Sequence, residues 1–169
     1  MAHILGVLAV LAFLLSFQLK KRQNIILVNI ASRIFYILQY IFLGALEGAV
    51  LDFSGFVFSF LARYKEKPFV TKHLKVIIIA VNVLLIAVGL SLYENVFSLF
   101  AIGGIVLEIM ALWLTKEKNI RMLSLVCLPF WLTYNIANGA YSSAVGNVLG
   151  MVSIALAMLR LDFKKTNNE

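Results

Sequence analysis

Long apolar runs separated by short polar breaks dominate this chain. The runs cover residues 2–19, 25–45, 47–63, 75–92, 95–114, 120–138 and 140–160. Each approaches the ~20 residues that a helix needs to cross a bilayer, and none alternates as a membrane β-strand does. The pattern therefore predicts an all-α membrane protein with seven transmembrane helices.

Composition supports this class and argues against others. Hydrophobic residues make up 62% of the chain and charged residues 14%, whereas soluble domains are roughly half apolar and about a quarter charged. One Cys and two His argue against a disulfide framework or a zinc cluster. Since catalytic and phosphate-binding motifs are also missing, we expect neither enzyme activity nor a cofactor or metal.

Basic residues gather in alternate polar breaks. If alternate breaks face one side of the membrane, that side holds 14 of the 15 Lys and Arg residues, and the other side holds Glu47 and Glu94, which we expect to be solvated. The positive-inside rule makes the basic side cytoplasmic, with the N-terminus outside and the C-terminus inside. The net charge of +7 then reflects topology, so we expect no nucleic-acid partner. The basic set is Lys20, Lys21, Arg22, Arg63, Lys65, Lys67, Lys72, Lys75, Lys116, Lys118, Arg121, Arg160, Lys164 and Lys165.

The chain repeats itself. A shift of 95 residues pairs Asn24-Ile25 with Asn119-Ile120, Gly44-Ala45 with Gly139-Ala140, and Gly55 with Gly150. A shift of four helices keeps direction across the membrane, so the repeats are parallel. We therefore predict a single membrane domain over 1–169 with a 3+1+3 plan of two parallel three-helix-bundle repeats. Its parts are a first repeat (1–65), a cytoplasmic loop and linker helix (66–94), a second repeat (95–162) and a cytoplasmic tail (163–169).

Polar and aromatic residues form stripes on equivalent helices of the two repeats. Tyr36 and Asp52 lie sixteen positions apart in the first repeat, as do Trp131 and Asn147 in the second. All four are expected near the membrane midplane. Ionisable residues within spans are costly, so Arg33 is expected to pair with Asp52 or Glu108. The predicted substrate-binding residues are Arg33, Tyr36, Asp52, Trp131, Asn135 and Asn147.

The 3+1+3 plan resembles that of the SWEET and PQ-loop superfamily of small-molecule transporters over the whole chain. The opening Gly6-x-x-Ala9, then Ser16-Phe17-Gln18-Leu19-Lys20 and a basic loop, resembles the YgjV-like bacterial inner-membrane proteins. In SWEET-type transporters an aromatic residue on the second helix and an Asn on the third line the substrate site. The resemblance assigns these roles to Trp131 and Asn147, with Tyr36 and Asp52 as a diverged pair. The superfamily's Pro-Gln pair is absent, because Phe17-Gln18 and Leu112-Trp113 stand in its place.

These features predict a transporter or facilitator of the bacterial inner membrane. The solute would be sugar-like or another small polar molecule, which aromatic faces and amides suit. Transport would be by alternating access, passive or ion-coupled, because no ATP-binding motif is present. The partners would be the solute and the lipid bilayer, and both a monomer and a homo-oligomer stay open.

Two alternatives stay open. One is a vitamin- or nucleoside-type facilitator of the same fold. The other is a non-transporting scaffold or partner subunit, in which the charges form a structural ion pair, Tyr36 and Trp131 pack the core, and Asn147 bonds between helices. A sealed, dry core favours the scaffold, whereas a water-filled cavity favours transport.

Overall fold

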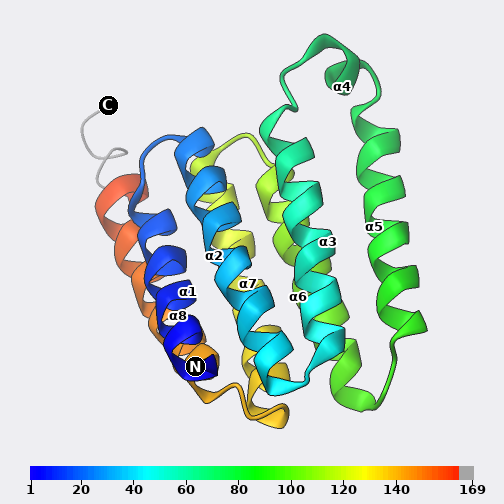
Figure 1. Ribbon diagram of the computed structural model, residues 1–169. Coiled ribbons are helices and arrows are strands. Elements are labelled where there is room, and N and C mark those ends of the chain that lie inside the picture. The colour runs from blue at the N-terminus through cyan, green and yellow to red at the C-terminus, as the bar shows by residue number, and fades with distance from the viewer. Residues whose placement is uncertain (164–169) are drawn as a thin grey trace.

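The computed structural model describes residues 1–163. Of the tail expected over 163–169, residues 164–169, with Lys164 and Lys165, lie outside the described residues. Within that range the chain forms eight α-helices, one π-helical turn and no strand. Seven long helices follow the seven apolar runs, and one short helix lies in the 63–75 break. The elements are α1 (Ala2–Gln18), α2 (Arg22–Leu43), α3 (Leu46–Arg63), α4 (Pro68–Lys72), α5 (Leu74–Ser91), α6 (Val96–Trp113), α7 (Glu117–Ala137), α8 (Tyr141–Met158) and the turn Leu159–Phe163 (Figure 1).

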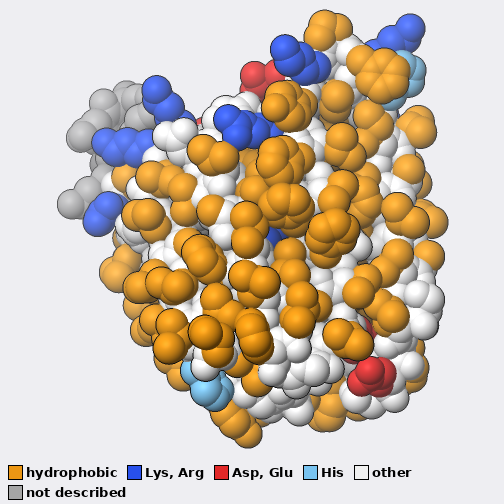
Figure 2. Space-filling model, in the orientation of Figure 1, with side chains coloured by type: hydrophobic (Ala, Val, Ile, Leu, Met, Phe, Trp, Pro, Cys, Tyr) orange, Lys and Arg blue, Asp and Glu red, His pale blue; other side chains and the backbone are white. Residues whose placement is uncertain are grey.

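Five of the helices are long and apolar enough to cross a membrane, namely α2, α5, α6, α7 and the segment Tyr141–Asp162 that contains α8. Helix α1 is slightly shorter, with 17 residues, and α3 carries Glu47, Asp52 and Arg63. Large apolar side chains cover the flanks of the molecule, and Lys and Arg gather at one end (Figure 2). So broad an apolar surface is typical of contact with lipid.

Local sequence signals set the helix ends. Gly44 and Gly139 follow α2 and α7 with φ angles of 74° and 68°, a left-handed conformation that glycine adopts at little cost. The Asn95 side chain accepts a hydrogen bond from the Phe97 N–H at the start of α6, and the Ser98 hydroxyl completes the capping box. Both kinds of cap satisfy backbone groups that a helix terminus leaves unpaired.

Six helices form a closed ring. Its neighbours are α1 and α2, α2 and α3, α3 and α6, α6 and α7, α7 and α8, and α8 and α1. Figure 1 shows α1, α2 and α3 in front of α8, α7 and α6. Helix α5 packs outside the ring against α3 and α6 and is buried over only a small part of its length.

The helix bounds follow the 95-residue shift. Helix α3 (Leu46–Arg63) maps onto α8 (Tyr141–Met158), and α1 and α2 map onto α6 and α7 to within a residue. The ring obeys the same correspondence, since the α3–α6 contact maps onto the α8–α1 contact. The ring therefore consists of a first set, α1 to α3, and a second set, α6 to α8, whose helices have equivalent bounds and equivalent neighbours.

Candidate functional site

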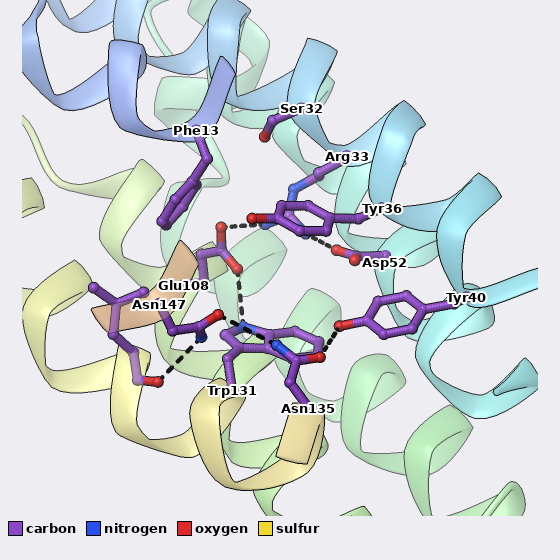
Figure 3. A pocket seen from close by; sticks show the side chains of 11 residues that line it. Phe13, Ser32, Arg33, Tyr36, Tyr40, Asp52, Glu108, Trp131, Asn135 and Asn147 are labelled. Atoms are coloured by element: carbon purple, nitrogen blue, oxygen red, sulfur yellow. Dashed lines mark hydrogen bonds and ion pairs between the residues drawn. The ribbon is translucent and has the colours of Figure 1, made fainter. Parts of the chain in front are cut away.

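A small polar cavity of about 30 Å³ lies in the centre of the ring. A buried water needs roughly 10–15 Å³ by the same measure, so the cavity has room for about two water molecules. All six predicted site residues line it, together with five others (Figure 3). The full lining is Phe13, Ser32, Arg33, Tyr36, Tyr40, Asp52, Glu108, Leu128, Trp131, Asn135 and Asn147.

The lining follows the repeat almost completely. Ten of its eleven residues form five pairs that the 95-residue shift relates, and Ser32 is the exception. The cavity therefore lies between the two sets, and both contribute equivalent positions to its lining. The pairs differ in polarity, so the cavity is symmetric in position but not in chemistry. They are Phe13 and Glu108, Arg33 and Leu128, Tyr36 and Trp131, Tyr40 and Asn135, and Asp52 and Asn147.

Three charged side chains meet at one side of the cavity. The Arg33 guanidinium lies with Nη1 2.6 Å from Asp52 Oδ1 and Nη2 3.0 Å from Glu108 Oε1. The expected pairing of Arg33 is thus confirmed, with both acids rather than one. Gly55 makes room for this arrangement, because a Cβ there would stand 2.5 Å from Nη1.

The two carboxylates differ in their other partners. Glu108 Oε1 accepts a hydrogen bond from Asn29 Nδ2 at 3.2 Å, and Oε2 accepts one from Trp131 Nε1 at 3.1 Å. Asn29 Oδ1 accepts from Arg33 Nε, which fixes the orientation of this amide. Asp52 receives a hydrogen bond from Arg33 alone among the described residues, and that bond is to Oδ1.

An uncharged chain of hydrogen bonds forms the other side. The Tyr40 hydroxyl donates to Asn135 Oδ1 at 2.6 Å, Asn135 Nδ2 donates to Asn147 Oδ1, and Asn147 Nδ2 donates to the Leu128 carbonyl. Tyr40 and Asn135 are repeat equivalents, and their bond links the first set to the second. The Trp131 and Tyr40 rings stack with their centroids 6.5 Å apart. The Trp131 indole donates to Glu108 of the charged cluster, and the Tyr40 hydroxyl donates to Asn135 of the uncharged chain.

At the basic end of the ring each set donates a buried arginine to the other. Arg22 of α2 donates to the carbonyls of Leu112 and Leu114 at the end of α6, at 2.7 and 3.0 Å. Arg121 of α7 donates to the equivalent carbonyls of α1 at 3.2 and 3.0 Å. Those carbonyls belong to Phe17 and Leu19.

Lys65 adds a third bond between the sets at this end. Its Nζ donates to the Trp113 carbonyl and the Thr115 hydroxyl, both at 3.0 Å. Burial, together with the nearby charge of Arg22, lowers the pKa of the Lys65 ammonium. Three buried cations therefore join the two sets around the ends of α1 and α6.

The opposite end is closed by hydrogen bonds of the Gln39 amide and the Glu47 carboxylate. Gln39 of α2 donates to the Ser142 hydroxyl and accepts from that of Ser143, at 2.9 and 2.6 Å. Glu47 is 4% exposed and accepts from the Ser98 hydroxyl of α6. The expectation that Glu47 is solvated was wrong, because α6 packs over it. Glu94 is exposed as expected.

Comparison with known proteins gives the chain a family. The model of a family named Imp-YgjV, described as a bacterial inner membrane protein, matches residues 1–165. The chain belongs to this family. No curated protein and no solved structure matches it. With its apolar helices, this Imp-YgjV protein is a multi-pass protein of the bacterial inner membrane.

Glu108, Phe13 and Tyr40 line the cavity but are not among the predicted substrate-binding residues. Glu108 was expected as a partner of Arg33, and it also lines the cavity, as does Phe13. The signal was available, because Phe13 and Glu108 are related by the same 95-residue shift as the predicted pairs.

Proposed function

We propose that this protein moves a small polar solute across the inner membrane through the central cavity. In this proposal seven helices span the bilayer as two parallel three-helix repeats, α1 to α3 and α6 to α8, with α5 as the linker. The N-terminus lies outside and the basic end faces the cytoplasm, as the positive-inside rule favours.

The observation that carries the proposal is the placement of the polar residues. They lie between the two sets and come from equivalent positions of both. A polar site between repeats is the arrangement that allows one repeat to rock against the other around a fixed solute. Charged residues inside a bilayer are also expensive, which favours a functional role for them.

The contacts at the two ends would act as gates. Opening the basic end requires Arg22, Arg121 and Lys65 to leave the carbonyls of the opposite set, and water can replace each of these bonds. Opening the other end requires Gln39 to leave Ser142 and Ser143, and Glu47 to leave Ser98. With both ends tied and a cavity of about 30 Å³, the structure corresponds to an occluded state, which must widen toward ~300 Å³ to enclose a solute.

Solute flux into proteoliposomes tests the proposal. Purified protein is tested with labelled sugars, nucleosides, vitamins and amino acids, and any hit is repeated with Trp131→Ala and Asn147→Ala. We expect flux of at least one solute and its loss in both variants. Phe42→Ala is the matched control, because Phe42 is 59% exposed on the lipid-facing surface and its loss should leave flux unchanged.

A scaffold or partner-subunit function is the second candidate. It is favoured by the small volume of the cavity and by the hydrogen bonds that already occupy Glu108, Trp131, Asn135 and Asn147. In that case none of the solutes would cross, and Trp131→Ala and Asn147→Ala would lower stability without removing any flux.

A further inference from the structure

The central cavity holds two acids and one base. Its charged lining residues are Arg33, Asp52 and Glu108, all at least nine-tenths buried. With every side chain in its usual ionic form, the cluster has one negative charge in excess. An uncompensated charge in such a setting is strongly unfavourable, and in practice a group neutralises instead.

Within residues 1–163, which the structure describes, no other group around the cavity supplies the missing positive charge. Asp52 lies on α3, which packs against α2, α5 and α6. Helix α2 presents Arg33 and the neutral phenols of Tyr36 and Tyr40 to the cavity, and α6 presents Glu108. The only charged residue of α5 is Lys75, in its first turn at the basic end. From farther round the ring α7 adds only neutral residues to the cavity lining, with Trp131 and Asn135 among them.

The hydrogen bonds indicate which of the two acids takes up a proton. A protonated oxygen must donate, but Glu108 Oε2 faces the Trp131 indole N–H, which can only donate. Glu108 Oε1 faces Asn29 Nδ2 and Arg33, and the bond from Arg33 to Asn29 Oδ1 prevents that amide from turning over. Asp52 Oδ2 has no donor among the described residues and is not sealed from the cavity.

We propose that the cavity is a binding site for a single positive charge, held as a proton on Asp52 Oδ2 while no solute is present. The Asp52 carboxylate takes H⁺ from water, which brings the cluster from a net charge of −1 to zero. Oδ1 keeps its hydrogen bond from Arg33, and the Oδ2 hydroxyl points to the cavity. Glu108 stays ionised, because it accepts hydrogen bonds from Asn29 and Trp131 and forms an ion pair with Arg33.

The charge balance of the cavity also favours one class of solute, a conclusion that rests on the proposed function. A solute with one ammonium group restores neutrality when the Asp52 proton leaves to water, so the exchange of one cation for another conserves charge. The stacked rings of Trp131 and Tyr40 add aromatic faces that attract such a cation. The site therefore favours monovalent organic cations over neutral or anionic solutes of equal size.

Infrared spectroscopy of the full chain in lipid vesicles at neutral pH tests the proton directly. We expect a carbonyl stretch of a protonated carboxyl group that shifts in D₂O. The band should vanish in Asp52→Asn, and also in Glu108→Gln, where Asp52 and Arg33 are left as a neutral ion pair. In Arg33→Leu the band should double, because both acids are then protonated.

Control variants and salts make the outcome decisive. Glu47→Gln removes the buried acid outside the cavity and should leave the Asp52-dependent band unchanged. A spectrum without any band sensitive to Asp52→Asn and Glu108→Gln overturns the inference. So does a thermal stability that rises with Na⁺ or K⁺ in the wild type alone, since a metal ion would then hold the place of the proton.

Adding methylammonium to the same samples separates the two proposals. The exchange of cations is supported if methylammonium removes the Asp52 band and one proton is released. Methanol at equal concentration should cause neither change. A band that meets the criteria above but ignores the ammonium probe leaves the proton site in place and contradicts the solute class. Failure of transport alone, with the band intact, counts against the proposed function only.

Discussion

Replacing Arg33 should reveal how strongly the charged cluster is coupled. Arg33→Leu removes the contacts of 2.6 and 3.0 Å to Asp52 and Glu108, which are 4% and 8% exposed. Breaking a buried ion pair by deleting one partner costs about 3–5 kcal/mol. In Arg33→Leu the cost arises because Glu108 must take up a proton while Asn29 and Trp131 still direct donors at it. Asp52→Asn should cost only about 1 kcal/mol, since the amide oxygen still accepts from Arg33 and Glu108 still pairs with it.

The double variant Arg33→Leu/Asp52→Asn gives the first repeat the residues that the second repeat has at the equivalent positions, Leu128 and Asn147. Only Glu108 then lacks its cation, and Asn29 and Trp131 still donate to it. We expect the double variant to be more stable than the sum of the single losses by about 1–3 kcal/mol. Denaturant titration in detergent micelles measures each free energy of unfolding. Losses that simply add would refute the coupling.

Three further predictions follow from packing, hydrogen bonding and topology. Gly146→Ala would place a Cβ 2.1 Å from Val10 Cγ2, so it should destabilise the α1–α8 contact by about 1–3 kcal/mol. Adding Val10→Ala should restore most of the thermal stability. A Gly146→Ala variant as stable as the wild type would contradict this packing. Arg121→Gln should cost about 1–3 kcal/mol, because two buried carbonyls and the Asp162 carboxylate lose a charged donor. An unchanged melting temperature would show that these bonds contribute nothing. A cysteine in place of Glu94 should react with impermeant maleimide from outside and one in place of Lys118 only from the cytoplasm, and the reverse pattern would invert the proposed topology.

The hydrophobic pattern located the long helices, because a segment in a bilayer must pair its backbone polar groups internally, as a helix does. It misplaced some ends. Helices α2 and α7 begin at Arg22 and Glu117, three residues before the apolar runs, because a polar residue can continue a helix when it finds partners there. Arg22 does so by bonding carbonyls of α3 and α6. The short helix α4, which starts with Pro68, lies in a polar break that gives no apolar signal.

The repeat was the most informative feature for the site. It identified equivalent aromatic and polar positions, and the structure brings all six predicted residues to one cavity. Other properties depend on packing between segments far apart in the chain, which a linear pattern does not encode. The burial of Glu47 under α6 and the volume of the cavity are of this kind. So is the exchange of Arg22 and Arg121 between the two sets, since the two arginines are not at equivalent positions.

Two-sided labelling of a cysteine placed at Asn147 is the most direct test of a transport site at the centre of the ring. The background is Cys127→Ser, because the native thiol is buried. Val81→Cys, on the buried side of α5 and outside the cavity lining, is the matched unreactive control. If the cavity opens alternately, a small water-soluble reagent should reach the cysteine at position 147 when added to either side, and Arg22→Gln with Arg121→Gln should speed the reaction from the basic end. A cysteine at 147 as unreactive as one at 81, from both sides and in both backgrounds, would contradict alternating access and favour the sealed scaffold.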